Sequence, residues 1–265
     1  MPFYSIRHET KYQFEHPPKQ AIQHLHLTPK SGPGQIVKKW DINLEGADIA
    51  FESRDHHGNI VHIAVQRSAQ TTVVITATGD VEIYDTSGIF GEHDNMLPLP
   101  LFRQNSEYCS AGPMLKKRAR HMPADDDELS FLHSLSAFVA KNVRYERGHT
   151  DSSSTAEEAA QMGFGVCQDH VHVFLALARH AGIAARYVSG YLMEPGFVDI
   201  AASHAWAEAY VNELGWVGFD ISNAMSPNAN YVRLASGFDY SDIQPVAGLR
   251  FGEGAEKMSA KVTIQ

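Results

Sequence analysis

Cys167 has the sequence setting of a nucleophilic cysteine. It follows Gly163-Phe-Gly-Val and stands where a strongly apolar helix is expected to begin. Glycines allow the backbone to turn sharply, and the positive end of a helix favours the thiolate form of a cysteine. A lone free cysteine is more often a small buried residue, so Cys167 needs partners elsewhere in the chain.

His204 supplies the first potential partner. It opens the segment His-Ala-Trp-Ala-Glu-Ala-Tyr, whose alternation predicts a strand. The alternation places His204, Trp206, Glu208 and Tyr210 on one face and small residues on the other. A histidine there could take a proton from a thiol across a cleft, although alone it could equally be a hydrogen-bonded structural histidine.

Asp220 ends the apolar run Gly215-Trp-Val-Gly-Phe. A carboxylate in such a strand needs a partner, because burying an unpaired charge is costly, and an imidazole is the natural one. Read alone, Asp220 could be a surface carboxylate at a strand end. Read together, the three residues predict a triad in which Cys167 attacks, His204 is the base and Asp220 orients the base.

The predicted triad places a condition on the hairpin that carries His204 and Asp220. In an antiparallel pair, opposed residues have position numbers of constant sum, and residues two apart share a face. Pairing Val211 with Trp216 gives an odd sum, which sets His204 opposite Asn223 and sends Asp220 to the other face. We therefore expect a three- or five-residue connection, or a β-bulge.

Several nearby residues could support the triad. Gln168 and Asp169 fall in the first helical turn, where they could orient the thiol or cap the helix. Additional hydrogen-bond donors for an oxyanion are expected among three tyrosines, and the sequence does not choose between them: Tyr145, Tyr191 and Tyr210. Trp206 and Trp216 could line a substrate groove or serve as core aromatics.

These motifs resemble, in order and spacing, the core of bacterial transglutaminase-like proteins. The resemblance rests on Gly165-Val-Cys-Gln-Asp169, Arg186-Tyr-Val-Ser-Gly-Tyr191, His204-Ala-Trp-Ala-Glu208 and Gly215-Trp-Val-Gly-Phe-Asp220. The N-terminal segment, with its Asp55-His-His-Gly-Asn59 turn, resembles the β-rich domain that often precedes this core. Two departures, Ile221-Ser-Asn223 after the aspartate and Phe238 where the family often has a basic residue, concern loops that face the substrate.

The resemblance implies that Cys167, His204 and Asp220 match the family's catalytic triad. It implies a cysteine protease or amidase that works through a thioester, with hydrolysis favoured over transfer to an amine. The alternatives are a cross-linking transglutaminase and a non-enzymatic peptide-binding module that uses the same cleft. A metal site is not expected at His170 and His172, because residues two apart on a helix do not face one another. No cofactor is predicted.

The order of elements predicts an α+β fold in two parts. Strands expected at 36–44, 60–65 and 71–83, separated by turn residues, indicate a β-sandwich over residues 1–95. A proline-punctuated linker is expected over 96–123. The acidic run Asp125-Asp-Asp-Glu128 is expected to open a helix, and Thr155-Ala-Glu-Glu158 fits the capping box of a second, short helix. Residues 124–265 would form the papain-like, transglutaminase core, with the cysteine-bearing helix packed on an antiparallel sheet whose strands lie near 185–193, 204–211 and 216–221.

Composition limits the partners and the compartment. The 265-residue chain has a formal net charge of −9, which disfavours nucleic acid and anionic membranes as main partners. Two cysteines are too few for a disulfide framework, and no secretory signal or membrane-spanning stretch is seen. We expect a cytoplasmic protein with free thiols that acts on a peptide or protein substrate. The sequence does not predict the oligomeric state.

Overall fold

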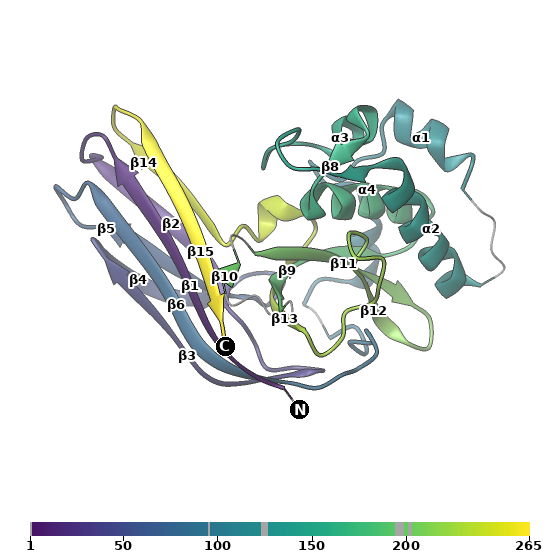
Figure 1. Cartoon of the computed structure of the whole chain (residues 1–265), viewed down its shortest axis with the longest axis horizontal. Helices are drawn as coiled ribbons and strands as arrows, with labels where there is room; N and C mark the ends of the chain where they lie inside the picture. The colour runs from purple at the N-terminus through teal and green to yellow at the C-terminus, as the bar shows by residue number, and fades with distance from the viewer. Residues whose placement is uncertain (1, 95, 123–126, 194–198, 201–202) are drawn as a thin grey trace.

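The computed structural model describes residues 2–94, 96–122, 127–193, 199–200 and 203–265. A β-sandwich stands at one end of the molecule, and a sheet covered by helices stands at the other (Figure 1). This is the α+β arrangement that the sequence predicted. The nucleophile helix lies in the second part.

The sandwich consists of two antiparallel sheets. The first has the order β10-β15-β1-β6-β3 and the second the order β14-β2-β5-β4. Their strands are β1 (Phe3–Phe14), β2 (Gln20–Thr28), β3 (Gln35–Glu45), β4 (Ala47–Arg54), β5 (Ile60–Gln66), β6 (Thr72–Ile83), β10 (Asp199–Ile200), β14 (Val246–Phe251) and β15 (Glu256–Ile264). Alternate residues of these strands, including Leu25, Ala64 and Ile75, are buried between the sheets.

The strands predicted at 36–44, 60–65 and 71–83 are confirmed as β3, β5 and β6. Two further strands, β2 before β3 and β4 between β3 and β5, were not predicted. In β4 only Ala47 is buried, because this strand lies at the edge of its sheet. An exposed edge strand does not need the apolar alternation by which a half-buried strand is recognised.

The C-terminal strands return to the sandwich. β14 pairs with β2, and β15 pairs with β1 over nine residue pairs from Ile6–Ile264 to Phe14–Glu256. Residues 246–264, which the sequence grouped with the core, therefore complete the N-terminal sheets. This pairing provides hydrogen-bond partners for backbone groups that would otherwise lie on open sheet edges. No local sequence pattern predicts it, because the paired strands are far apart in the chain.

The second part has a four-stranded antiparallel sheet of order β12-β11-β9-β13. These strands are β9 (Ala185–Leu192), β11 (His204–Val211), β12 (Gly215–Phe219) and β13 (Tyr231–Gly237). Helix α4 (Cys167–His180) packs on this sheet, and three further helices surround α4: α1 (Pro113–Ala119), α2 (Glu128–Asn142) and α3 (Ala156–Met162). Four short elements complete the part: η1 (Leu99–Arg103), β7 (Arg144–Tyr145), β8 (Phe164–Gly165) and η2 (Tyr240–Asp242).

Local signals fix the ends of these helices as expected. Asp127 caps α2 by accepting hydrogen bonds from the N–H groups of Leu129 and Ser130, whereas Asp125 and Asp126, also expected at this start, lie outside the described residues. Thr155 and Glu158 form the predicted capping box of α3.

The segment expected as a linker is packed into the molecule. Within residues 96–122, Phe102, Cys109 and Leu115 are completely buried. Just before this segment, Phe90 and Gly91 exchange backbone hydrogen bonds with Trp216, so the chain adds an edge to β12. The prolines break the hydrophobic periodicity of this segment, but they do not expose the segment to solvent. Apolar residues that lie between short turns can still be buried.

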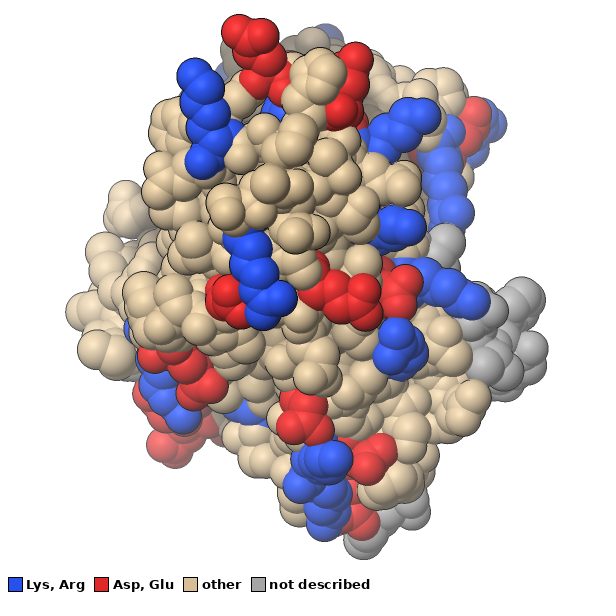
Figure 2. Space-filling view, turned by 90° about the vertical axis from the view of Figure 1, so that its left-hand side faces the viewer, with Lys and Arg blue, Asp and Glu red and all other residues tan. Residues whose placement is uncertain are grey.

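The two parts share one continuous core. The largest apolar cluster joins Ile6 and Val81 of the sandwich to Phe174 and Leu177 of α4. Among the described residues, no helix is long and apolar enough to cross a membrane. The outer face of the sandwich carries acidic and basic side chains that alternate over its described surface, with no extended patch of one sign (Figure 2).

Candidate active site

Cys167 is the first residue of α4, and the residue is partly exposed. Asp169 fixes the turn before it, because its Oδ2 accepts hydrogen bonds from the Val166 N–H and the Thr150 hydroxyl, both at 2.7 Å. A Cβ on Gly165 would lie 2.5 Å from the Asp169 Cβ, so glycine is required for this close approach. Asp169 thus takes the helix-capping position.

His204 lies between the two other predicted members of the triad. Its Nε2 is 2.6 Å from Asp220 Oδ2, and its ring also forms a hydrogen bond with Cys167. Because Nε2 faces the carboxylate, Nδ1 is the nitrogen left for the thiol. The structure therefore brings together the three side chains that the sequence singled out, from a helix, a strand and the loop that follows β12.

The hairpin meets the condition that the triad requires. Val211 pairs with Gly215, so β11 and β12 are joined by three residues and the position numbers of opposed residues have an even sum. His204 and Asp220 consequently fall on the same face. The odd register, in which Val211 would face Trp216, is not adopted.

Asp220 is completely buried and is held by several donors. Its Oδ2 accepts hydrogen bonds from the Tyr231 hydroxyl at 2.7 Å and from Asn223 Nδ2 at 2.8 Å, in addition to His204. The Asn223 N–H donates to Oδ1 at 3.2 Å. A carboxylate with this many donors is fixed in position and remains ionised.

Electrostatics favour a charged pair at this site. Burial alone would lower the pKa of His204, but the hydrogen bonds and charges of Asp220 and Cys167 outweigh it and raise the pKa to about 10. Burial works in the opposite direction on Asp220, whose pKa is nevertheless lowered by its bonds to His204, Asn223 and Tyr231. At neutral pH the imidazole is therefore protonated beside the Cys167 sulfur and the Asp220 carboxylate.

The three tyrosines considered as oxyanion donors lie in different surroundings. The Tyr191 hydroxyl is 2.8 Å from His8 Nδ1 and ties β9 to the sandwich. Tyr210 packs its ring against Trp216, and Tyr145 sets the edge of its exposed ring toward His170. No hydrogen bond within the described part of the chain joins any of them to the triad.

Gln168 turns toward the preceding loop, where its Nε2 donates to the Ser152 carbonyl at 3.2 Å. Two tyrosines that the sequence did not single out interact electrostatically with Cys167. Burial raises the pKa of Tyr187 and of Tyr240, and the charge of Cys167 raises both pKa values further. Nothing in the local sequence distinguishes them from other aromatic residues.

Trp206 and Trp216 are core aromatics, each essentially inaccessible to solvent. Trp206 packs against the Tyr231 ring, with centroids 5.4 Å apart, and lies nearly parallel to His204. Trp216 supports Arg186, whose guanidinium lies 3.9 Å from the centre of its ring. Of the two roles considered for them, groove and core, their burial and contacts are those of core aromatics that support the residues around the site.

Metal ligands come together at a different place. His56, His57 and Asp242 bring one potential ligand atom each within 4.8 Å of one another, where the sandwich meets η2. His57 Nε2 is 3.1 Å from Asp242 Oδ2, so these two groups already form a protein–protein hydrogen bond. The pair His170 and His172 is satisfied by the protein, through Val143 and Ser154 carbonyls.

Comparison with known families agrees with this fold. The profile of the transglutaminase-like superfamily matches residues 116–221, and that of the bacterial transglutaminase-like N-terminal region matches residues 4–82. Together they cover most of the chain, which belongs to the transglutaminase-like superfamily. The first match contains Cys167, His204 and Asp220.

Similar proteins occur in several bacteria. An uncharacterised protein of Mycobacterium leprae is 26% identical over 272 residues, which cover 98% of this chain and 97% of that protein. An uncharacterised protein of Mycobacterium tuberculosis is 26% identical over 273 residues, with 93% and 87% covered. A crystal structure of a candidate cysteine protease from Cytophaga hutchinsonii has the same fold, with a TM-score of 0.81 and 21% identity, covering 99% of this chain and 90% of that one.

Proposed function

We propose that this protein is a cysteine-dependent acyl-transfer enzyme that acts on peptide or carboxamide bonds of a peptide or protein substrate. The observation that carries the proposal is the His204 ring, which is bonded to Asp220 on one side and to Cys167 on the other. Cys167 is partly exposed, as a nucleophile that meets a substrate should be. Asp220 is buried, as a residue that orients the base should be.

The first half of the reaction forms a thioester. The Cys167 sulfur attacks the carbonyl carbon, a C–S bond forms, and the C–N bond breaks as the His204 imidazolium gives its proton to the departing nitrogen. In the second half, water attacks the thioester carbonyl and loses a proton to His204. The C–S bond then breaks, which releases the acid and restores the thiolate–imidazolium pair.

The tetrahedral intermediates need donors for their oxyanion. The first N–H groups of a helix have no partner within the helix, and Cys167 begins α4. Within the described chain its own N–H finds no other acceptor. This N–H points out of the positive end of the helix, where it would stabilise the developing negative charge.

We further propose that water rather than an amine resolves the thioester. The support is the description of the Cytophaga protein, which shares the fold over nearly the whole chain, as a candidate cysteine protease. Transfer to an amine uses the same thioester and would produce a new amide bond. The two outcomes therefore differ only in the second nucleophile, and product analysis separates them.

The test combines labelling with turnover. A peptide carrying a thiol-reactive electrophile should label the wild-type protein at Cys167, as located by mass mapping. The Cys167→Ala variant should not react, and Cys109→Ala should react like wild type. Peptide libraries should then be cleaved or deamidated by wild type and not by Cys167→Ala. A protein that labels only at Cys109, or a Cys167→Ala variant with full turnover, would overturn the proposal.

A further inference from the structure

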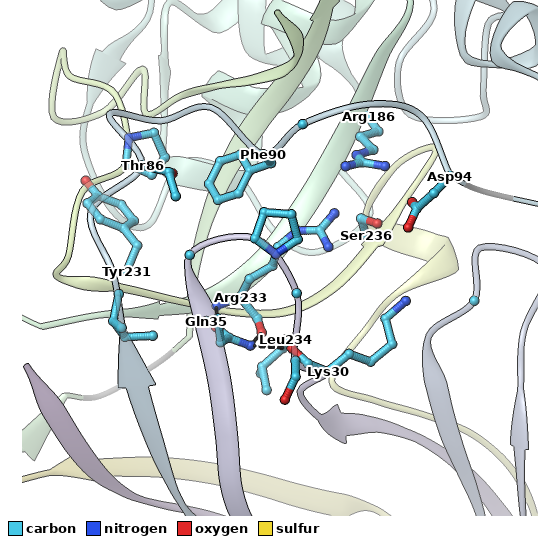
Figure 3. Close-up of a pocket in the computed structure, with 18 of the residues that line it drawn as sticks. Lys30, Gln35, Thr86, Phe90, Asp94, Arg186, Tyr231, Arg233, Leu234 and Ser236 are labelled. Carbon is cyan, nitrogen blue, oxygen red and sulfur yellow. Dashed lines mark hydrogen bonds between the residues drawn. The ribbon is translucent and has the colours of Figure 1, made fainter. Parts of the chain in front are cut away.

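A cavity of about 540 Å³ lies between the sandwich and the sheet of the second part. Its walls include Gln35 of β3, Phe90 in the segment after β6, and Tyr231 of β13 (Figure 3). Cys167 and His204 do not line it. The cavity is therefore separate from the nucleophile, although Tyr231 belongs to both places through its hydrogen bond to Asp220.

The walls of this cavity are positively charged on two sides. Lys30 and Arg54 come from the sandwich, and Arg186 and Arg233 come from β9 and β13. Glu208 is completely buried and accepts hydrogen bonds from both of the core arginines, at 2.6 Å from Arg186 Nε and 3.0 Å from Arg233 Nε. Two exposed carboxylates, Glu92 and Asp94, also line the cavity, so the four cations outnumber the three carboxylates, Glu208 included, by one.

Arg186 has donors that the protein does not use. Its side chain is held rigidly, because Nε binds Glu208 and the guanidinium lies on the ring of Trp216. Arg186 is only 7% exposed, yet its two terminal nitrogens have no acceptor in the described part of the chain. These two donors belong to a side chain that lines the cavity, so they are available to an acceptor that enters the cavity from outside the chain.

Lys30 faces the same space from the opposite wall (Figure 3). Burial, and then the charges of Arg233, Arg54 and Arg186, lower the pKa of its ammonium group. Among the described residues no carboxylate lies within ion-pair distance of it. Asp94 contributes a favourable charge to Lys30 and Arg186 but is exposed and forms no ion pair with either.

We propose that this cavity binds a small dicarboxylate. One carboxylate would accept hydrogen bonds from the unused nitrogens of Arg186, beside Arg233, and the other would pair with Lys30 on the facing wall. Arginine forks match carboxylates, as the pairing of Glu208 already shows in this protein. The cavity volume accommodates a ligand larger than a single inorganic anion.

Calorimetric titration of the full chain with glutarate tests the proposal. Cys167 is first blocked with iodoacetamide, so that any binding reports a place other than the thiol. Glutarate should bind saturably, whereas neutral glutaramide, which has the same length, and inorganic phosphate should not. The Lys30→Gln variant should weaken glutarate binding by about tenfold, the value of one charge-assisted hydrogen bond.

Lys257→Gln is the matched control, because it removes the same charge from an exposed position on β15. It should leave glutarate binding unchanged. Lys30 is preferred to Arg186 for the test, since removing Arg186 would strip Glu208 of a buried partner and threaten folding. Equal binding of glutaramide, binding of phosphate in place of glutarate, loss of binding after blocking Cys167, or unchanged affinity in Lys30→Gln would overturn the proposal.

Discussion

His204 and Asp220 lie on the same face of the β11–β12 hairpin because the turn between these strands contains three residues. Gly215 makes that turn possible. Its φ of +82° is in the left-handed region, and a Cβ at this position would lie 2.0 Å from the Gly91 carbonyl oxygen. A single glycine therefore sets both the register of the hairpin and its contact with the segment before η1.

We predict that Gly215→Ala lowers the free energy of unfolding by more than the ~1–2 kcal/mol that a left-handed conformation costs an alanine. The backbone of residue 91 must also move, which disturbs the pairing of the chain with β12. Urea unfolding measures the loss, and activity should fall with it because the register that aligns His204 with Asp220 is disturbed.

Gly182→Ala is the matched control for this variant. Gly182 has a φ of +85°, almost the same as Gly215, but a Cβ there meets no atom within 4 Å. Gly182→Ala should lower the free energy of unfolding only by the cost of the left-handed backbone conformation, and it should leave activity intact. Equal losses in the two variants would show that the contact with Gly91 does not matter.

The pH dependence of kcat/KM should have an alkaline limb near pH 10. The pKa of His204 is raised to about 10, so the imidazolium that protonates the leaving nitrogen persists through neutral pH and is lost as the pH rises through that value. Asp220→Asn removes a charge and an acceptor that raise this pKa, so the limb should move to lower pH and kcat/KM should fall by about 100-fold. A limb that stays in place in Asp220→Asn would contradict the assignment.

The two cysteines should differ in their reaction with iodoacetamide at pH 7. Cys167 is partly exposed beside the protonated His204, whereas Cys109 is fully buried and burial raises its pKa to about 12. Mass mapping should find Cys167 modified first, and both residues modified after denaturation. His204→Ala should slow the labelling of Cys167 and leave that of Cys109 unchanged; faster labelling of Cys109 in the native wild type is the opposing result.

Tyr231→Phe tests the hydroxyl that fixes Asp220. Loss of a hydrogen bond to a buried carboxylate costs about 1.5–3 kcal/mol, so kcat should fall by roughly tenfold or more and the alkaline limb should shift. Tyr191→Phe removes an equally buried hydroxyl that contacts His8. This control should lose stability while it keeps the pH profile of wild type, and the idea fails if both variants show the same profile.

The sequence by itself determined the chemistry of the candidate site. Cys167, His204 and Asp220 were identified because they occur together, one at an expected helix start and two on successive expected strands, whereas each read alone had an ordinary structural interpretation. The sequence also predicted two helix caps, at Asp127 and Thr155, and three strands, β3, β5 and β6. Capping and alternation depend on residues only a few positions apart, so a local sequence pattern is sufficient to predict them.

Tertiary structure decided what depends on distant contacts. The hydroxyl of Tyr231 reaches Asp220 from β13, which lies at the opposite edge of the sheet from β12, and no local sequence pattern predicts that contact. The return of β14 and β15 to the sandwich depends on strand edges more than 200 residues away in the chain. The cavity between Lys30 and Arg186 likewise forms where two parts of the chain pack against one another, and each part contributes cations. The order of charges along a sequence does not predict which of them will lie close together in the folded protein.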